Sequence, residues 1–159
     1  VLRDATAAYD KGLISEAELI ATCAEVAGIQ KSVVAKAIEP RSDKNLRLLD
    51  YAKQLKDVGV KIGLLSNIND DWVRQKFLND EEQKIFDEIL LSYEVGEVKP
   101  KPEPYLEIAR RIGVELGQCI MVDDVERNCY GAEAVGMKSV LFQSTEQAMG
   151  AIEELIGRE

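Results

Sequence analysis

Apolar positions recur with a helical period at the start of the chain. Ser15 and Glu18 have the spacing of a capping box, in which each side chain bonds the backbone N–H of the other residue. The apolar residues that follow share one predicted helical face: Leu19, Ile20, Cys23, Val26 and Ala27. Gly28 ends this helix, and a shorter helix is predicted over residues 31–38. Residues 1–41 are therefore expected to form helices only.

From Ser42 onward, helical and strand patterns alternate. Short apolar runs predict strands over residues 60–65, 89–91, 119–122 and 139–142. Apolar residues at helical spacing predict helices over residues 46–55, 71–77, 104–112, 127–135 and 144–156. Strands that alternate with helices are typical of crossover units in a mostly parallel sheet. We therefore expect an α/β domain over residues 42–159, joined to the helical domain by a linker at residues 39–43.

The composition excludes several classes of function. A net charge of −9 argues against nucleic acid and anionic membranes as partners. The chain has no histidine, which excludes histidine zinc sites and Ser–His–Asp or Cys–His catalysis. Its three cysteines, Cys23, Cys119 and Cys129, form no C-x-x-C pair, so we expect reduced thiols in a cytoplasmic protein. No apolar run approaches the length of a membrane span, and no signal peptide is recognised.

Polar residues follow three successive predicted strands. Ser66 and Asn67 come after the first strand, Lys99 after the second, and Asp123 and Asp124 after the third. Ligands of an open parallel sheet bind beyond the carboxyl ends of its strands, so these side chains are expected to meet at one edge. A hydroxyl, an ammonium and two carboxylates at that edge suit a phosphate and a divalent cation, since Mg²⁺ prefers oxygen ligands.

Each of these residues also has a purely structural explanation. Ser66 and Asn67 suit a turn or a helix cap, and an isolated Lys99 would be an ordinary surface lysine. Asp123 and Asp124 are residues commonly found at helix N-caps, and a helix is predicted to start near Arg127. Their joint placement after successive strands favours a binding site over these separate explanations.

Three segments resemble motifs of the haloacid dehalogenase superfamily. Residues 64–67 (LLSN) resemble its second motif, and residues 95–100 (VGEVKP), with the helix up to residue 114, resemble its third. Residues 121–124 (MVDD), continuing to residue 137, resemble the acidic fourth motif. The resemblance spans residues 44–142, and residues 1–41 resemble the small helical cap of one branch. It implies a three-layer Rossmann-like parallel sheet with a partial helical cap.

The resemblance also implies roles for the phosphate-binding residues. Ser66 would bind the phosphoryl group beside the backbone amide of Asn67, and Lys99 would neutralise charge on the phosphate and on the nucleophile. Lys101 lies close to Lys99, but the spacing to Gly113 favours Lys99 as the catalytic lysine.

The acidic motif implies a metal site of the phosphatase kind. By resemblance, Asp124 would help to hold Mg²⁺, and Asp123 would assist the metal or pair with the motif lysine. Asn128 stands where many relatives carry a further acid, so it would be an outer ligand. True dehalogenases of this superfamily need no metal and carry Ser-Ser-Asn at this position. The acidic pair Asp123-Asp124 therefore resembles the phosphatases and not the dehalogenases.

The family's first motif, an apolar strand that ends in Asp-x-Asp, has no counterpart here. Its first aspartate attacks phosphorus, and its second is the general acid and base. The early aspartates all lie in predicted helical or linker sequence: Asp4, Asp10, Asp43, Asp50 and Asp57. Because Val1 already lies in a helix-like stretch, we expect that upstream residues have been cut away or left out.

The absent strand should lie at the centre of the sheet, between the strands that contain Leu64 and Met121. Unpaired backbone groups next to the gap need partners. We therefore expect these two strands either to pair directly with each other or to recruit a strand from another chain, which would give a homodimer.

The sequence leaves two main hypotheses for function. The first is a Mg²⁺-dependent phosphatase that acts on a small phosphorylated metabolite through a phospho-aspartate and lacks its nucleophile segment here, so that this chain alone is inactive. The second is a non-catalytic, truncated relative that binds phosphate or a protein partner. A receiver domain of a signalling relay fits poorly, because receivers open with their acidic pair whereas here the serine and lysine come first.

Overall fold

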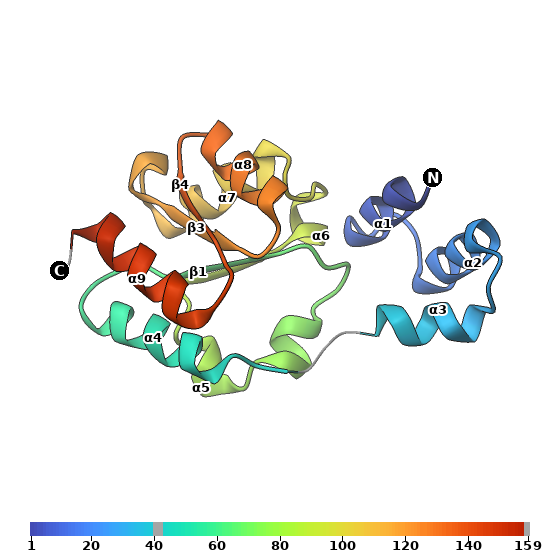
Figure 1. Ribbon diagram of the computed structural model, residues 1–159, viewed down its shortest axis with the longest axis horizontal. Helices are drawn as coiled ribbons and strands as arrows, with labels where there is room; N and C mark the ends of the chain where they lie inside the picture. The colour runs from blue at the N-terminus through green and yellow to red at the C-terminus, as the bar shows by residue number, and fades with distance from the viewer. Residues whose placement is uncertain (40–42, 158–159) are drawn as a thin grey trace.

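The structure, a computed structural model, describes residues 1–39 and 43–157. In it, helices surround two pairs of short parallel strands (Figure 1). The helices are α1 (Leu2–Asp10), α2 (Glu16–Ala27), α3 (Lys31–Ile38), α4 (Leu46–Asp57), α5 (Asp80–Gln83), α6 (Ser92–Val95), α7 (Pro102–Ile112), α8 (Glu126–Ala134) and α9 (Thr145–Ile156). The strands are β1 (Gly63–Ser66), β2 (Glu88–Leu91), β3 (Ile120–Asp123) and β4 (Lys138–Leu141). A π-helical turn, η1, covers Val73–Phe77, and a 3₁₀ turn, η2, covers Leu116–Gln118.

The first three helices form a group of their own beside the α/β core (Figure 1). The predicted capping box is confirmed, because Ser15 Oγ accepts from the Glu18 N–H at 3.3 Å and the Ser15 N–H donates to the Glu18 carboxylate at 2.8 Å. Gly28 ends α2 in the left-handed conformation, with φ 65°. The expected domain boundary after residue 41 falls on residues 40–42, which lie outside the described residues.

Helices cover both faces of the strands, as the α/β prediction required. On one face, α4 and α9 pack over β4 through Tyr51, Leu55, Val140 and Ile152. On the other face, Leu90 of β2 contacts a cluster from α7 and α8 that contains Tyr105, Ile108, Ala109 and Ala132. Both strand pairs are parallel, with Ser66 opposite Leu91 in one and Asp123 opposite Leu141 in the other. The carboxyl ends of β1 and β3 therefore carry the residues predicted to form the site.

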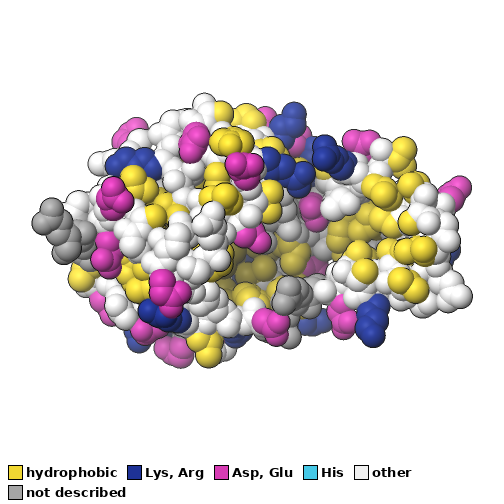
Figure 2. All heavy atoms as spheres, in the orientation of Figure 1, with side chains coloured by type: hydrophobic (Ala, Val, Ile, Leu, Met, Phe, Trp, Pro, Cys, Tyr) yellow, Lys and Arg dark blue, Asp and Glu magenta, His cyan; other side chains and the backbone are white. Residues whose placement is uncertain are grey.

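The two strand pairs remain separate: within the described parts of the chain, β1 pairs only with β2, and β3 only with β4. Of the two expected outcomes, the direct pairing of β1 with β3 is therefore wrong, and the recruitment of a strand from another chain stays a prediction. A mainly apolar cavity of about 590 Å³ is lined by Leu64 and Leu65 of β1, by Met121 and Val122 of β3, and by helix residues such as Leu55. Each pair packs on its own helices, so closing the gap would require those helix contacts to break. Figure 2 shows hydrophobic side chains at the bottom of a hollow beside α9.

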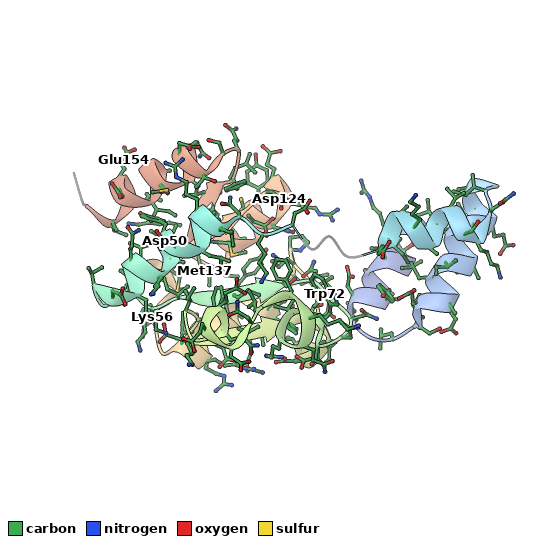
Figure 3. The ribbon with its side chains drawn as sticks, turned by 90° about the horizontal axis from the view of Figure 1, so that it is seen from below. Asp50, Lys56, Trp72, Asp124, Met137 and Glu154 are labelled. Carbon is green, nitrogen blue, oxygen red and sulfur yellow. The ribbon has the colours of Figure 1, made fainter. Side chains whose placement is uncertain are left out.

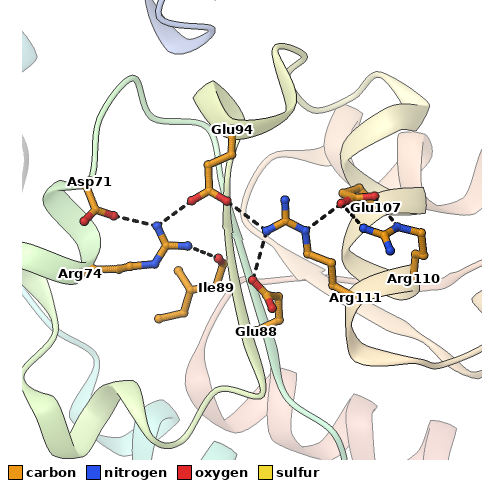
Figure 4. Close-up of polar contacts among 8 residues, drawn as sticks. All are labelled: Asp71, Arg74, Glu88, Ile89, Glu94, Glu107, Arg110 and Arg111. Atoms are coloured by element: carbon orange, nitrogen blue, oxygen red, sulfur yellow. Dashed lines mark hydrogen bonds and ion pairs between the residues drawn. The ribbon is translucent and has the colours of Figure 1, made fainter.

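An ion-pair network ties η1, β2, α6 and α7 together on the surface of the core (Figure 4). Arg74 bonds the Ile89 carbonyl and contacts the carboxylates of Asp71 at 2.7 Å and Glu94 at 2.6 Å. Glu94 also accepts from Arg111 at 3.1 Å. The network fixes the start of the segment that leads from β2 to the predicted lysine.

A close approach between α8 and the lysine loop depends on Gly131. A Cβ atom at this position would lie 2.6 Å from the Pro100 carbonyl oxygen and 2.9 Å from the Tyr105 hydroxyl. Both distances are shorter than a van der Waals contact. The Pro100 carbonyl oxygen belongs to the backbone, so it cannot rotate away as the end of a side chain could. Only glycine lets α8 pack this closely against the loop.

We predict that Gly131→Ala lowers the free energy of unfolding by about 1–3 kcal/mol through overpacking. Gly150→Ala is the matched control, because Gly150 also lies in a helix and a Cβ there meets nothing within 4 Å. That control should be neutral or stabilising by up to about 1 kcal/mol, since alanine is the better helix former. Urea unfolding of the two variants measures both effects, and equal stability of the two would contradict the close approach.

Candidate functional site

Lys99 and Asp123 form a buried ion pair where the ends of β1 and β3 meet the loop after α6. The Lys99 Nζ and Asp123 Oδ2 atoms lie 2.6 Å apart, and the two side chains are only 9% and 5% exposed. Lys99 Nζ also donates to the Leu65 carbonyl at 3.0 Å. Lys101, in contrast, is exposed at the N-cap of α7. The structure thus buries Lys99 beside Asp123 and leaves Lys101 exposed, and the assignment of Lys99 as the catalytic lysine stays a prediction.

The second carboxylate oxygen of Asp123 is also engaged. Oδ1 accepts from the Val125 N–H at 2.8 Å and from Asn128 Nδ2 at 3.0 Å. Of the two roles expected for Asp123, the structure displays the pairing with Lys99. Both oxygens are held by donors, which stabilises the ionised carboxylate in its buried position.

Asp124 and Asn128 offer oxygen atoms beside this pair. Asn128 is buried, and its Oδ1 atom has no hydrogen-bond partner, although its backbone carbonyl accepts from Tyr105 Oη at 2.8 Å. Burial and the charge of Asp123 raise the pKa of Tyr105, so its hydroxyl stays protonated as the donor. Asp124 is exposed. A buried, unpaired amide oxygen next to a solvent-facing carboxylate fits a hard cation that retains several waters.

No group of three or more His, Cys, Asp or Glu side chains is positioned to hold a metal ion in residues 1–39 and 43–157. Figure 3 shows that Asp124 and Trp72 lie toward the end of the core that faces α1–α3, whereas Glu154 lies farther away.

The residues after β1 are held by side-chain bonds. Asn67 Oδ1 accepts from the Lys99 N–H at 2.9 Å, and Asn67 Nδ2 donates to the Lys99 carbonyl at 3.1 Å. Ser66 is half-buried, and its hydroxyl makes no hydrogen bond to another described residue. The structure thus places Ser66 at the end of β1 and Asn67 directly after it, next to the Leu65 carbonyl that binds the Lys99 ammonium.

Ser92 is a buried polar residue that the sequence reasoning missed. Its hydroxyl accepts from the Ile68 N–H at 2.8 Å and lies 2.5 Å from the Asp10 carbonyl, to which it donates. A Lys11–Glu97 ion pair of 2.6 Å lies nearby in sequence and adds a second link between α1 and the core. The signal was present, because Ser92 directly follows the second predicted strand just as Ser66 follows the first.

The contact between α1 and the core also partly buries the carboxyl group of Asp10, the last residue of α1. Burial raises the pKa of Asp10 to about 6, because desolvation disfavours the charged form. The contact between α1 and the core is therefore partly shielded from water at Asp10.

None of the helices in the described parts of the chain is long and apolar enough to cross a membrane.

Comparisons with known proteins agree with this geometry. The model of the haloacid dehalogenase-like hydrolase family matches residues 14–136. "Putative phosphatase YhcW" of Bacillus subtilis is 37% identical over 95 residues, and the match covers 57% of this chain and 41% of the relative. Glyceraldehyde 3-phosphate phosphatase of Methanopyrus kandleri is 31% identical over 90 residues, covering 55% of this chain and 38% of that enzyme. These matches span about two fifths of the length of the curated relatives.

A solved structure supports the same assignment. A HAD family enzyme of Bacteroides thetaiotaomicron, in complex with magnesium and inorganic phosphate, superimposes with a TM-score of 0.68 at 25% sequence identity. The superposition covers 91% of this chain and 76% of that enzyme.

We predict that Lys99→Met lowers the free energy of unfolding by about 3–5 kcal/mol, because it leaves the Asp123 carboxylate buried without its counter-ion. The matched control is Lys84→Met, which breaks the exposed Lys84–Glu81 ion pair and should change stability far less, because solvent screens an exposed pair. Chemical denaturation at neutral pH measures both. A loss for Lys99→Met no larger than for the control would mean that the charge of Lys99 is not buried.

Proposed function

This chain belongs to the haloacid dehalogenase-like hydrolases, and from that premise we propose that it forms part of a Mg²⁺-dependent phosphatase for a small phosphate ester. The observation that carries the proposal is the buried Lys99–Asp123 ion pair, which lies next to Asn128 and at the end of β1. Such a pair holds an ammonium in place before a substrate arrives, as electrostatic stabilisation of phosphoryl transfer requires.

The chain's own residues would share the work of binding and charge neutralisation. The Ser66 hydroxyl and the Asn67 backbone N–H would hold phosphoryl oxygens, and Lys99 would neutralise the charge that develops on them. Asp124 and Asn128 Oδ1 would hold the cation, and Asp123 would orient Lys99. When bound, Mg²⁺ would supply Lewis-acid stabilisation of the phosphoryl oxygens.

The nucleophilic aspartate would come from a strand that this sequence does not contain. The cavity between β1 and β3 supports this part of the proposal, because it is mainly apolar and, among the described residues, no strand pairs with β1 or β3 on that side. A parallel strand inserted there would end beside Lys99 and Asp123, and its terminal aspartate would carry the covalent phosphoryl group. Residues 42–159 would then be the catalytic core, and residues 1–41 a partial cap over it.

The alternative is a non-catalytic relative that binds phosphate or a partner chain. Among the described residues, Asp123 is the only carboxylate in contact with Lys99, and both of its oxygens are committed. In this alternative the same cavity would recruit a strand from a second copy and give a homodimer. Further expected features, a small phosphorylated metabolite as ligand, no nucleic-acid or membrane partner and a cytoplasmic location, suit either function.

We predict that this chain binds Mg²⁺ weakly through Asp124. Calorimetric titration of the chain and of Asp124→Asn should show an affinity loss of about tenfold or more in the variant, because a charged oxygen ligand is replaced by a neutral amide. Asp50→Asn, on the exposed side of α4, is the charge-matched control and should titrate like the unaltered chain. Identical titrations for Asp124→Asn and the control would remove Asp124 from the metal site.

We also predict that hydrolysis requires the added strand. The chain alone, assayed with an aryl phosphate and Mg²⁺, should show no enzyme-like turnover, since Ser66 has no adjacent base and covalent catalysis is lost. Fusing an upstream apolar strand that ends in Asp-x-Asp should give Mg²⁺-dependent turnover. The control is the same strand ending in Asn-x-Asn, which should raise the melting temperature equally without turnover. Mg²⁺-dependent turnover by the chain alone, lost in Asp124→Asn, would overturn the proposal.

A further inference from the structure

The side chain of Asn67 binds the backbone of Lys99 at two points. Its oxygen accepts from the Lys99 N–H at 2.9 Å, and its amide nitrogen donates to the Lys99 carbonyl at 3.1 Å. The amide therefore satisfies both polar groups of one peptide residue, as a neighbouring strand would do. Asn67 is the first residue after β1, and Lys99 lies 32 positions later in a different loop.

The backbone of Lys99 lies in a turn, in which the Lys101 N–H donates to the Val98 carbonyl at 2.9 Å. Lys99 lies between the end of α6 at Val95 and the start of α7 at Pro102, outside any strand. A loop residue with a long side chain has many accessible conformations, and ordering it costs entropy. Its Nζ nevertheless reaches two fixed partners, the Leu65 carbonyl at 3.0 Å and Asp123 at 2.6 Å.

The two sets of contacts converge on β1. The Asn67 amide fixes the backbone of Lys99 just beyond the strand end, and the Leu65 carbonyl receives the ammonium two residues earlier. Lys99 is thus held at both ends of its length by one short segment, residues 65–67. This arrangement directs the ammonium across the sheet toward Asp123, which lies on β3.

We propose that Asn67 is a positioning residue for Lys99, and that its side chain serves the lysine and not the ligand. The oxygen and one N–H of the amide are already committed, so a phosphate oxygen that accepted from that N–H would displace the Lys99 carbonyl. The consequence for catalysis rests on the proposed function, but the positioning itself does not depend on turnover.

The test measures the Lys99 ammonium directly in the intact chain. With ¹⁵N-labelled lysine, the buried and hydrogen-bonded ammonium of Lys99 should give a slowly exchanging NMR signal in the unaltered chain. Asn67→Ala should broaden or abolish this signal. The rate of Lys99 acylation, followed by mass spectrometry, should rise about tenfold or more when both hydrogen bonds are lost.

Two further variants separate positioning from general destabilisation. Asn69→Ala is the matched control, because Asn69 lies in the same loop but bonds Tyr9, and it should leave the Lys99 signal unchanged. Asn67→Gln keeps the amide but displaces it by one methylene, so it should behave like Asn67→Ala. Exposed Lys138 is the internal standard for the acylation rate, and an unchanged circular dichroism spectrum of each variant shows that the fold is intact.

An unchanged Lys99 signal and acylation rate in Asn67→Ala would overturn the inference, and so would an equal effect in Asn69→Ala. Neither readout uses a substrate, a metal or the absent strand. If the lysine is released in Asn67→Ala but the strand-fused protein shows no hydrolysis, the positioning stands and the proposed phosphatase activity fails.

Discussion

The buried ion pair between Lys99 and Asp123 is the contact on which the rest of the site depends. Two charges withdrawn from water are tolerated only when they meet each other and when their remaining hydrogen-bonding groups also find partners. Those partners come from β1, from the turn after β3 and from α8: the Leu65 carbonyl, the Val125 N–H and the Asn128 amide. The pair therefore requires three elements that are far apart in sequence to meet at fixed distances.

This requirement explains several residues that have no chemistry of their own. Tyr105 reaches from α7 to the carbonyl of Asn128 and holds the first turns of α8 in register with Asp123. Gly131 then lets α8 approach the Pro100 carbonyl, one residue beyond the lysine. Ser92 bonds the backbone of Ile68 and so supports the loop that follows Ser66 at the end of β1. The polar contacts and the close packing around the pair constrain one another.

The sequence was enough to predict the order of most elements and the residues at the strand ends, because apolar periodicity and strand-end chemistry are local signals. It also favoured Lys99 over Lys101, and Lys99 is the lysine that the structure buries beside Asp123. It did not predict that β1 begins at Gly63, not at residue 60, or that the short helix α6 starts at Ser92. Nor did it predict that the Asn67 side chain bonds the Lys99 backbone. The two residues are 32 positions apart, and a single side-chain hydrogen bond over that distance produces no periodic pattern in the sequence. Contacts of that kind depend on packing, which sequence patterns do not encode.

The separation of the two strand pairs has a physical cause of its own. Unpaired strand edges favour collapse, since buried N–H and C=O groups need partners. Collapse would bring β1 and β3 together, but β1 is fixed to β2 and α7, whereas β3 is fixed to β4 and α8. Shifting either pair by the width of one strand, about 4.8 Å, would also pull the Leu65 carbonyl and Asp123 out of their shared contact with Lys99. Lys99 therefore links the end of β1 to the end of β3, because its ammonium bonds both the Leu65 carbonyl and the Asp123 carboxylate while the two strand pairs stay unpaired with each other in the described residues.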